Sequence, residues 1–343
     1  MPKYSFQNDY SEGAHPRILE ALVSSNLTQE IGYSEDRYCL SATEKIHKAL
    51  GNPDVDIHFV SGGTQANLLV MSSCMRPFES VIAVESGHIC VHETGAVEAT
   101  GHKVHTVKGK DGKVTTNEIQ AVVDEHYFEH MVKPRVVYIS QSTEVGTIYS
   151  AAELREISAL CKKLGLILFM DGARLGAALS SARADLDLKE TCSLVDALYI
   201  GGTKNGALIG EAIVINNPAL KPDFRYCIKQ RGALLAKGRL LGIQFDVLFN
   251  DNLFYDLARH ANLMAERLTR GMFAQGYNFL TDSPTNQIFP ILPNDVIAKL
   301  REDYLFYDWA KMDTTHTAVR LVTSWATPIE TIDEFLKDLK ILS

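Results

Sequence analysis

The sequence predicts an α/β fold, with a large, doubly wound, mostly parallel sheet domain at residues 1–250 and a small α+β domain at residues 251–343. Two apolar runs, at 166–170 and 195–200, are too short for buried helices and are typical of central parallel strands. Strand patterns alternate with helical patterns at the spacing of βαβ units. From about residue 252 the pattern changes to long helices with few glycines.

The elements are expected in the following chain order, after an irregular lead-in at 1–13. A polar, aromatic segment at 32–38 is either a loop or a lid over a site. Ser41 is expected to cap a helix, because Glu44 completes a capping box three residues later. Apolar spacing predicts further helices at 15–27, 65–75, 88–100, 116–130, 151–164 and 329–342, and strands at 58–60, 81–84, 103–107, 135–139, 212–215, 287–292 and 318–323.

Composition and charge exclude several classes of partner. The net charge is -8 and the 34 Lys and Arg residues are scattered, which argues against a nucleic-acid surface. No apolar run is long enough to cross a bilayer and the N-terminus has no signal-peptide core, so a cytoplasmic protein without a membrane partner is expected. The six cysteines lack CxxC spacing and are expected to be reduced.

Asp171 comes directly after the first central apolar run, and Lys204 comes just past the second, after Gly201, Gly202 and Thr203. Open α/β sheets bind their ligands at the carboxyl ends of such strands. A solvated loop lysine is one interpretation of Lys204. The other is a Schiff base between its amine and a pyridoxal aldehyde, with Asp171 keeping the pyridine nitrogen protonated so that the ring acts as an electron sink.

A Gly-Gly-Thr loop, Ser61-Gly62-Gly63-Thr64, connects a predicted strand to a predicted helix. Glycines allow a tight turn, and the first N–H groups of a helix are unpaired and attract anions. We therefore expect a phosphate cradle, although an ordinary strand-to-helix turn would give the same pattern. The loop lacks the GK[ST] of a P-loop.

His88 and His92 are four residues apart, with Glu93 next to His92. The order is not H-E-x-x-H, so no metal site is predicted. His88 follows a strand end, and we expect it to lie flat on an aromatic cofactor ring, whereas His92 is expected to be structural.

Arg320 alternates with Val319 and Leu321 in a predicted strand and therefore points to the opposite face. It is either a surface residue or a group that forks onto an amino-acid carboxylate.

Together these pieces resemble the low-specificity L-threonine aldolase group of pyridoxal-phosphate enzymes, within the β-eliminating lyases of aspartate-aminotransferase-like fold type I. The resemblance covers essentially the whole chain. Its most specific parts are Asp171-Gly172-Ala173-Arg174, which matches the family's D-G-A-R, the loop at 61–67 and the strand at 320–323. The family's S-K-G appears as Thr203-Lys204-Asn205.

The resemblance implies a pyridoxal 5'-phosphate enzyme that cleaves L-threonine, L-allo-threonine or a related β-hydroxy amino acid to glycine and an aldehyde. Lys204 would carry the Schiff base, His88 would be the first candidate for the base and His130 the second. A homodimer or homotetramer is implied, with residues 1–40 contributing to the site and the dimer and Tyr33 reaching the neighbouring subunit's site. Cofactor binding would involve Gly63, Thr64, Gln65, His88, Asp171, Arg174, Thr203 and Lys204, and substrate binding Asn8, Tyr33, Arg174 and Arg320.

Two segments depart from the family pattern, both on the substrate side. Asn8-Asp9-Tyr10 replaces S-D-T, and Gln141-Ser142-Thr143-Glu144-Val145 replaces E-N-T-H-N. The nearest alternative keeps the cofactor but changes the bond that breaks, as in a β-elimination on an amino acid. A non-catalytic phosphate-binding α/β module is the alternative from a different class.

Overall fold

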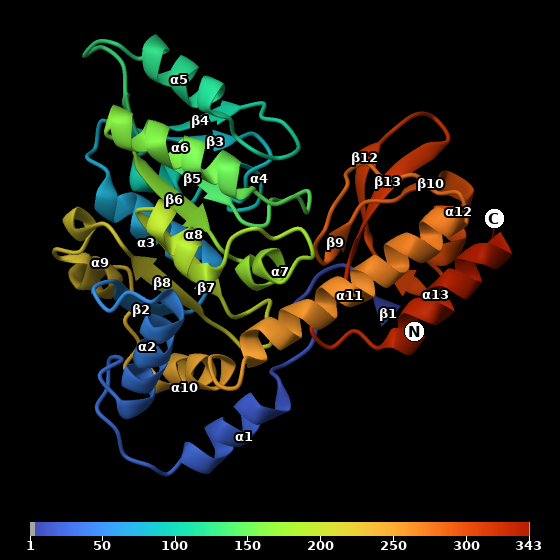
Figure 1. The fold of residues 1–343 in the computed structure, drawn as a ribbon, viewed down its shortest axis with the longest axis horizontal. Helices are drawn as coiled ribbons and strands as arrows, with labels where there is room; N and C mark the ends of the chain where they lie inside the picture. The colour runs from blue at the N-terminus through green and yellow to red at the C-terminus, as the bar shows by residue number, and fades with distance from the viewer. Residues whose placement is uncertain (1–3, 343) are drawn as a thin grey trace.

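The computed structural model describes residues 4–342, and its larger part is built on a seven-stranded sheet with strand order β2-β8-β7-β6-β5-β3-β4 (Figure 1). The strands from β4 through β3, β5 and β6 to β7 are parallel, whereas β8 runs antiparallel to both of its neighbours. This arrangement confirms the predicted mostly parallel α/β sheet. The strands are β2 (Asp56–Val60), β3 (Glu79–Val84), β4 (Val104–Val107), β5 (Lys133–Ser140), β6 (Ile167–Asp171), β7 (Ala197–Gly201) and β8 (Glu211–Ile215).

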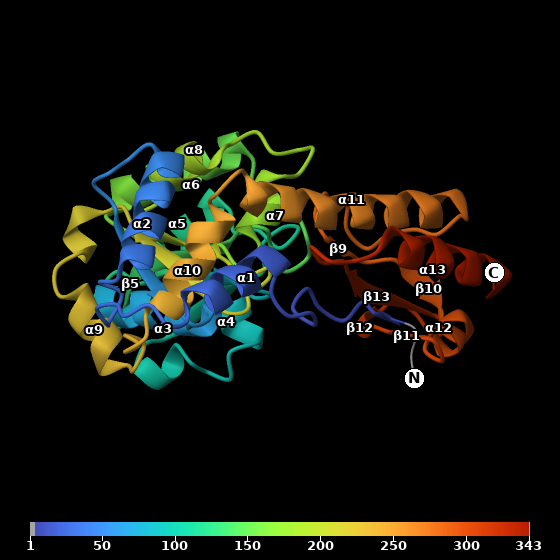
Figure 2. The same cartoon turned by 90° about the horizontal axis from the view of Figure 1, so that it is seen from below.

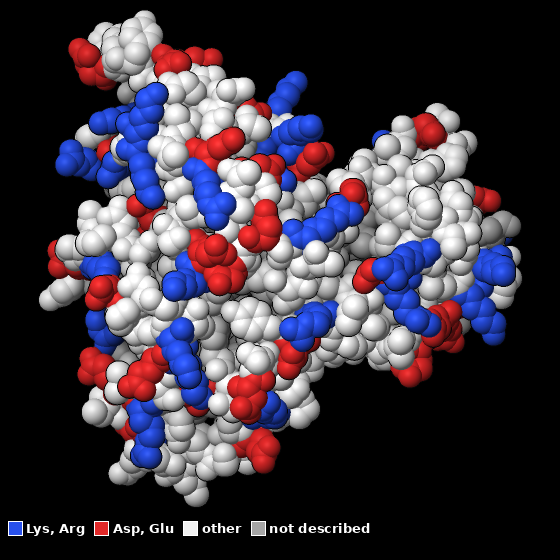
Figure 3. Space-filling model, viewed as in Figure 1, with Lys and Arg blue, Asp and Glu red and all other residues white. Residues whose placement is uncertain are grey.

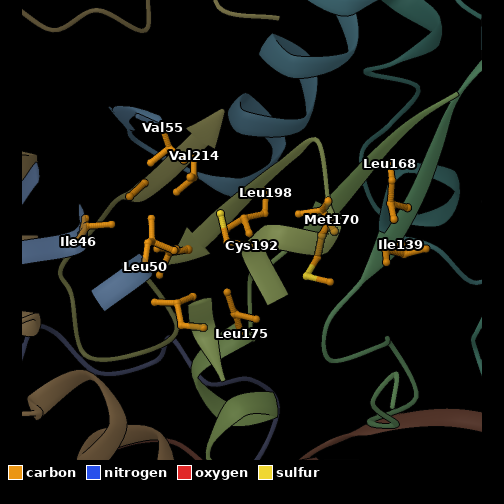
Figure 4. Close-up of a cluster of buried hydrophobic side chains, with 14 of the residues drawn as sticks. Ile46, Leu50, Val55, Ile139, Leu168, Met170, Leu175, Cys192, Leu198 and Val214 are labelled. Carbon is orange, nitrogen blue, oxygen red and sulfur yellow. The ribbon is translucent and has the colours of Figure 1, made fainter. Parts of the chain in front are cut away.

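Helices cover both faces of this sheet. Buried side chains of α2, α5, α6, α8 and α10 form a core with one face, and those of α3, α4 and α9 form a core with the other. Figure 4 shows part of the first core, where Met170 of β6 and Leu198 of β7 lie near Cys192 of α8. The helices are α1 (Pro16–Ser25), α2 (Arg37–Leu50), α3 (Gly63–Cys74), α4 (His88–Val91), α5 (Thr116–Glu125), α6 (Ala151–Leu164), α7 (Leu175–Leu179), α8 (Leu188–Leu194), α9 (Phe224–Gln230) and α10 (Arg239–Leu248).

The smaller part is an antiparallel sheet with order β10-β13-β12, in which β9 also pairs with β13. The 22-residue helix α11 extends from the large sheet to this sheet (Figures 1 and 2). The start of the chain also lies here, because β1 pairs with β11. The division near residue 250 stays a prediction. These elements are β1 (Tyr4–Ser5), α11 (Leu253–Ala274), β9 (Gln287–Ile288), β10 (Ile291–Pro293), α12 (Asn294–Leu300), β11 (Tyr304–Leu305), β12 (Tyr307–Lys311), β13 (His316–Val322) and α13 (Ile329–Leu342).

The predicted helix start at Ser41 is wrong, because α2 begins at Arg37. The carboxylate of Asp36 accepts hydrogen bonds from the backbone N–H groups of Tyr38 and Cys39, and this N-cap satisfies the unpaired end of the helix one turn earlier. Ser41 lies inside the helix, and its hydroxyl donates to Asp246 instead.

The predicted helix at 88–100 is also wrong beyond its first turn. Helix α4 ends at Val91, and Thr94 and Gly95 have φ angles of 53° and 71°, in the left-handed region that a helix does not contain. Helix α5 ends at Glu125, short of the predicted end at residue 130. Strand β12 and helix α12 were not predicted.

Charges of both signs are interspersed on the face shown in Figure 3, so this face has no continuous basic surface of the kind that binds nucleic acid. Within residues 4–342, no helix combines the length and the apolar character that spanning a bilayer requires.

Candidate active site

A cavity of about 300 Å³ lies at the carboxyl ends of β5, β6 and β7. Several predicted site residues line it together, from segments far apart in the sequence. Parallel strands end at the same edge of a sheet, which is why these segments meet. The lining residues are Tyr10, Ser61, Gly62, Gly63, Thr64, His88, Ser140, Ser142, Glu144, Asp171, Ala173, Arg174, Tyr199, Thr203, Lys204, Ile209 and Glu211.

Lys204 reaches this cavity from the loop after β7, and its Nζ atom lies 6.0 Å from the ring centroid of Tyr10. Burial, and then the positive charge of Arg174, lower the pKa of Lys204, while Asp171 acts in the opposite direction. A lysine with a lowered pKa has a larger fraction of neutral, nucleophilic amine near neutral pH. Lys204 therefore lies in the cavity with a lowered pKa, and its Schiff-base role stays a prediction.

Asp171 is the last residue of β6 and is 4% exposed. Its Oδ2 atom accepts hydrogen bonds from the hydroxyl of Tyr138 at 2.6 Å and from Nδ2 of Asn67 at 3.1 Å. Its Oδ1 atom accepts from the hydroxyl of Tyr199 and from the backbone N–H of Ala173. These donors hold the carboxylate in one orientation.

The same donors keep Asp171 ionised. Burial acts to raise the pKa of Asp171, but the charge of His88 and the hydrogen bonds from Tyr138 and Tyr199 outweigh it, and the net pKa is lowered. Burial and the adjacent carboxylate raise the pKa values of both tyrosines well above their usual range. The tyrosines therefore remain donors and Asp171 remains an anion.

The Gly-Gly-Thr loop forms the N-terminal end of α3, which begins at Gly63. A Cβ atom at Gly63 would lie 2.8 Å from the hydroxyl oxygen of Tyr199, whereas nothing lies within 4 Å of one at Gly62. The loop can therefore keep this position beside Tyr199 only with glycine at residue 63. The side chain of Gln65 points toward Ser61, and its Oε1 atom accepts hydrogen bonds from the backbone N–H and the hydroxyl of Ser61. Gln65 thus supports the loop and does not line the cavity.

His88 is the first residue of α4, and its Nδ1 atom lies 2.8 Å from Oε1 of Glu93. The side chain of Glu93 has 0% exposure. Oε1 of Glu93 also accepts from Nδ2 of Asn67 at 2.7 Å, and the same nitrogen donates to Asp171. Sequence reasoning gave no role to Glu93 or Asn67, and their link to His88 and Asp171 depends on tertiary contacts.

Arg174 lines the cavity and is held by Asp9, which accepts from its Nε atom at 2.7 Å and from its Nη2 atom at 3.0 Å. Nδ2 of Asn286 donates to the same carboxylate at 2.9 Å. Burial acts to raise the pKa of Asp9, but the charge of Arg174 and then that of Lys204 leave it lowered. Asp9 is therefore an ionised partner of Arg174 from the N-terminal segment.

Arg320 contacts two aromatic rings of β12, with its guanidinium carbon 5.6 Å from the ring centroid of Tyr307 and 5.5 Å from that of Trp309. Its Nη2 atom donates to the backbone carbonyl of Gln7, and its Nε atom is buried without a hydrogen-bond partner. Burial, and then the charge of Arg174, lower the pKa of Arg320. Arg320 is thus near Arg174 but is not among the cavity-lining residues.

Asn8, Tyr33 and His130 do not line the cavity. The Oδ1 atom of Asn8 accepts from the N–H of Tyr10 and the hydroxyl of Ser11, within its own loop. Tyr33 is 43% exposed, and Lys229 Nζ lies 4.7 Å from its ring centroid. His130 is exposed, after α5. The predicted substrate roles of Asn8 and Tyr33 stay predictions.

Two buried carboxyl groups in the cavity were missed. Oε1 of Glu144 accepts from the backbone N–H of His88 at 3.0 Å and from Oγ of Ser140 at 2.7 Å, whereas its Oε2 atom is buried without a partner. Burial raises the pKa of Glu144. Burial also raises the pKa of Glu211 to about 8, and its Oε2 atom accepts from the N–H of Gly202. Glu144 lies in the segment at 141–145 that the sequence placed on the substrate side, but neither it nor Glu211, the first residue of β8, was given a role.

No group of three or more His, Cys, Asp or Glu side chains within residues 4–342 is arranged to hold a metal ion. The polar atoms that lack partners in the cavity include Oε2 of Glu144 and Oγ of Ser142. These two atoms are therefore available to pair with a polar ligand in the cavity.

Comparison with known proteins gives one consistent result. The family model for beta-eliminating lyases matches residues 11–293. The low specificity L-threonine aldolase of Pseudomonas aeruginosa is 34% identical over 98% of this chain and 97% of that protein, and the one of Pseudomonas sp. (strain NCIMB 10558) is 35% identical over 98% and 96%. The structure of Leishmania major threonine aldolase is 50% identical, with a TM-score of 0.98 and coverage of 99% of this chain and 100% of that chain.

Proposed function

This chain belongs to the beta-eliminating lyase family, and we propose that it is a pyridoxal-phosphate-dependent aldolase that cleaves L-threonine, L-allo-threonine or a related β-hydroxy amino acid to glycine and an aldehyde. One observation carries the proposal: the amine of Lys204, with its lowered pKa, shares a cavity with the buried, ionised Asp171. An amine and an acid in this arrangement are the two groups that pyridoxal chemistry needs from a protein.

The donor set of the cavity fits pyridoxal phosphate. The N-terminal end of α3 at Gly63 and Thr64 suits a phosphate, and Thr203 lies at the same cavity wall. Oγ of Ser142 and Oε2 of Glu144 are buried without hydrogen-bond partners and would pair with polar atoms of the cofactor. When bound, the cofactor supplies an aldehyde for the amine of Lys204 and a ring that accepts the electrons of the broken Cα–Cβ bond.

Asp171 would hold a proton on the ring nitrogen of the cofactor. Its own pKa is lowered, so the carboxylate stays ionised and keeps an adjacent proton on a neighbouring base. The hydroxyls of Tyr138 and Tyr199 fix the direction in which it points. His88, on the cavity wall, is the side chain proposed to face the ring and to act as the base.

Arg174 and Arg320 would bind the substrate carboxylate. Nε and Nη2 of Arg174 donate to Asp9, which fixes the plane of the guanidinium group. Nη1 of Arg174 is then left for a ligand. Arg320 has a buried Nε atom without a hydrogen-bond partner, and its guanidinium carbon lies 5.6 Å and 5.5 Å from the ring centroids of Tyr307 and Trp309. A fixed carboxylate places the Cα–Cβ bond in one orientation, and orientation decides which bond breaks.

His88 would take the proton of the β-hydroxyl group as the Cα–Cβ bond breaks. Proton transfer by a positioned side chain needs a group within hydrogen-bond reach of the hydroxyl, which a cavity-lining residue can meet. His130, the second candidate for the base, is exposed and does not line the cavity. We therefore retain His88 for this role.

A homodimer or homotetramer is proposed for the assembly, with Tyr33 reaching a neighbouring site. The N-terminal segment supports this, because Val23, Leu27 and Ile31 are 76%, 93% and 67% exposed. Exposed apolar side chains in one segment are typical of an interaction surface. The cytoplasmic location also remains a proposal.

The test of the function is a product assay with the purified protein and L-threonine. The account predicts glycine and acetaldehyde in equal amounts. A 2-oxo acid with ammonia would instead show β-elimination at the same site. A colourless protein that borohydride does not modify would contradict the proposal that the protein binds pyridoxal phosphate.

A further inference from the structure

Glu93 is a buried acid that the proposed reaction does not use. Its side chain has 0% exposure, and it lies just after α4, where the left-handed φ angles of Thr94 and Gly95 turn the chain back. Its Oε1 atom contacts Nδ1 of His88 at 2.8 Å, and its Oε2 atom is buried without a partner. Burying an ionised carboxylate is costly unless donors or a positive charge compensate it. The ring of His88 is therefore one of the two side chains, with Asn67, that pair with the Glu93 carboxyl group.

The contact determines which nitrogen of His88 carries hydrogen. Oε1 of Glu93 already accepts a hydrogen bond from Nδ2 of Asn67, and an unprotonated carboxylate oxygen only accepts hydrogen bonds, so Nδ1 of His88 is the donor in this contact. A neutral imidazole has one N–H group, and Nε2 then keeps its lone pair. His88 lines the cavity that contains Lys204, so the basic nitrogen is the one left for a ligand.

We propose that Glu93 is a positioning residue that holds His88 in the Nδ1–H tautomer and so makes Nε2 the basic nitrogen of the cavity. This inference rests on the proposed function of His88 as the base. When Nε2 takes the β-hydroxyl proton, the imidazolium ring faces the Glu93 carboxylate, which stabilises it as the buried acid does in a Ser-His-Asp triad.

Asn67 fixes the acid in turn. Its Nδ2 atom donates to Oε1 of Glu93 at 2.7 Å and to Oδ2 of Asp171 at 3.1 Å. One amide thus connects the acid behind His88 with the acid proposed for the ring nitrogen. A displacement of Glu93 would be transmitted to both.

Other charged groups also face His88 and stay unchanged in the test. Glu144 and Asp171 interact with its charge, and the ring of His92 lies 5.5 Å away. Lys204 and Arg174 line the same cavity. These groups are not substituted in a variant at Glu93, so its pH profile differs from that of the wild type through Glu93 and through the Asn67 contact that joins Glu93 to Asp171.

The direct test is the tautomer of His88 in the cofactor-loaded protein. Protein labelled with ¹⁵N-histidine would be studied by long-range ¹H–¹⁵N correlation, with a His88→Gln sample to assign the signals. The proposal predicts a protonated Nδ1 and an unprotonated Nε2 at a pH where the ring is neutral. The opposite tautomer would overturn it. This measurement does not depend on turnover.

The second test compares Glu93→Gln with Glu98→Gln, an exposed acid outside the cavity. Glu93→Gln should lower kcat for L-threonine by about 10²-fold with a much smaller change in KM, because the acid acts on the base and not on the substrate. The acidic limb of its kcat/KM profile should move to lower pH, since the protonated ring loses its anionic partner. Glu98→Gln should match the wild type in both.

The outcomes separate this inference from the function on which it rests. Wild-type protein without aldolase activity would refute the function, whereas the tautomer would still be decided by NMR. Active wild-type protein with equal kinetics and pH profiles for the two variants would refute the role of Glu93. If thermal unfolding shows that Glu93→Gln does not fold, the tautomer of His88 in the wild-type protein tests the proposal by itself.

Discussion

Arg174 donates two hydrogen bonds to the buried carboxylate of Asp9, from Nε at 2.7 Å and from Nη2 at 3.0 Å, although the two residues are 165 positions apart. The pair joins the N-terminal segment to the loop after β6. Planar, bidentate pairs of this kind are strong and fix the orientation of the guanidinium group. Arg174, which lines the same cavity as Asp171, is thereby held in place before any substrate arrives.

Replacing Asp9 with Asn should raise KM for L-threonine by about tenfold, because Arg174 loses the anion that fixes its plane. Steady-state kinetics measure this. Asn8→Ala is the matched control, since the side chain of Asn8 bonds only within its own loop. A larger rise in KM for Asn8→Ala than for Asp9→Asn would support the substrate role predicted for Asn8. It would contradict the role of Asp9 in holding Arg174.

Replacing Asp171 with Ala should leave some bound cofactor but lower kcat by at least about 10²-fold, because the ring nitrogen loses its anionic partner. Bound cofactor is measured by visible absorption and turnover by the release of glycine. Wild-type turnover in this variant would exclude Asp171 from its role. Replacing Tyr138 or Tyr199, which hold Asp171, with Phe should lower kcat by less than replacing Asp171 with Ala.

Replacing Gly63 with Ala should weaken cofactor binding, because the new Cβ would lie 2.8 Å from the hydroxyl oxygen of Tyr199 and the loop would have to move. Titration of cofactor into cofactor-free protein measures the Kd. Gly13→Ala is the control, since nothing lies within 4 Å of a Cβ there. Equal Kd values for the two variants would show that the loop does not bind the cofactor.

Glu211 should make stability fall as pH rises in the cofactor-free protein. Burial raises its pKa to about 8 from the ordinary value of 4.5, so between these pH values the folded state binds a proton that the unfolded state has lost. The free energy of unfolding therefore decreases with pH in this window, by at most about 1.4 kcal/mol per pH unit for one group.

Glu211→Gln tests this dependence, because the variant has no carboxyl group at residue 211 to bind or release a proton. Its stability relative to the wild type should increase from pH 5 to pH 8 in urea unfolding experiments. Glu98→Gln, at an exposed position, should show a constant difference. A difference for Glu211→Gln that does not change with pH would show that this carboxyl ionises in the folded protein as it does in water.

The part of the site that the sequence predicted is the part that follows local rules. Asp171 comes directly after a short apolar run and Lys204 just past another, and Gly63 and Thr64 lie at a strand-to-helix turn, so position along the chain is sufficient to find them. Glu93 was hidden, because the helix predicted at 88–100 breaks after Val91 and turns its side chain toward His88.

The remaining differences have the same cause. The contact of Asp9 with Arg174 is long-range, and the burial of Glu211 depends on the pairing of β8 with β7. The start of α2 was misplaced because the carboxylate of Asp36 caps the helix before the capping box expected at Ser41 and Glu44. Local patterns predict elements, whereas packing decides between competing patterns.

The most direct test of the central claim is to locate the cofactor on the chain. The purified protein would be reduced with borohydride, digested, and analysed by mass spectrometry. The account predicts a pyridoxal phosphate adduct on Lys204, and Lys204→Ala should yield none. An adduct on a different lysine of the wild-type protein, or no adduct at all, would contradict the account.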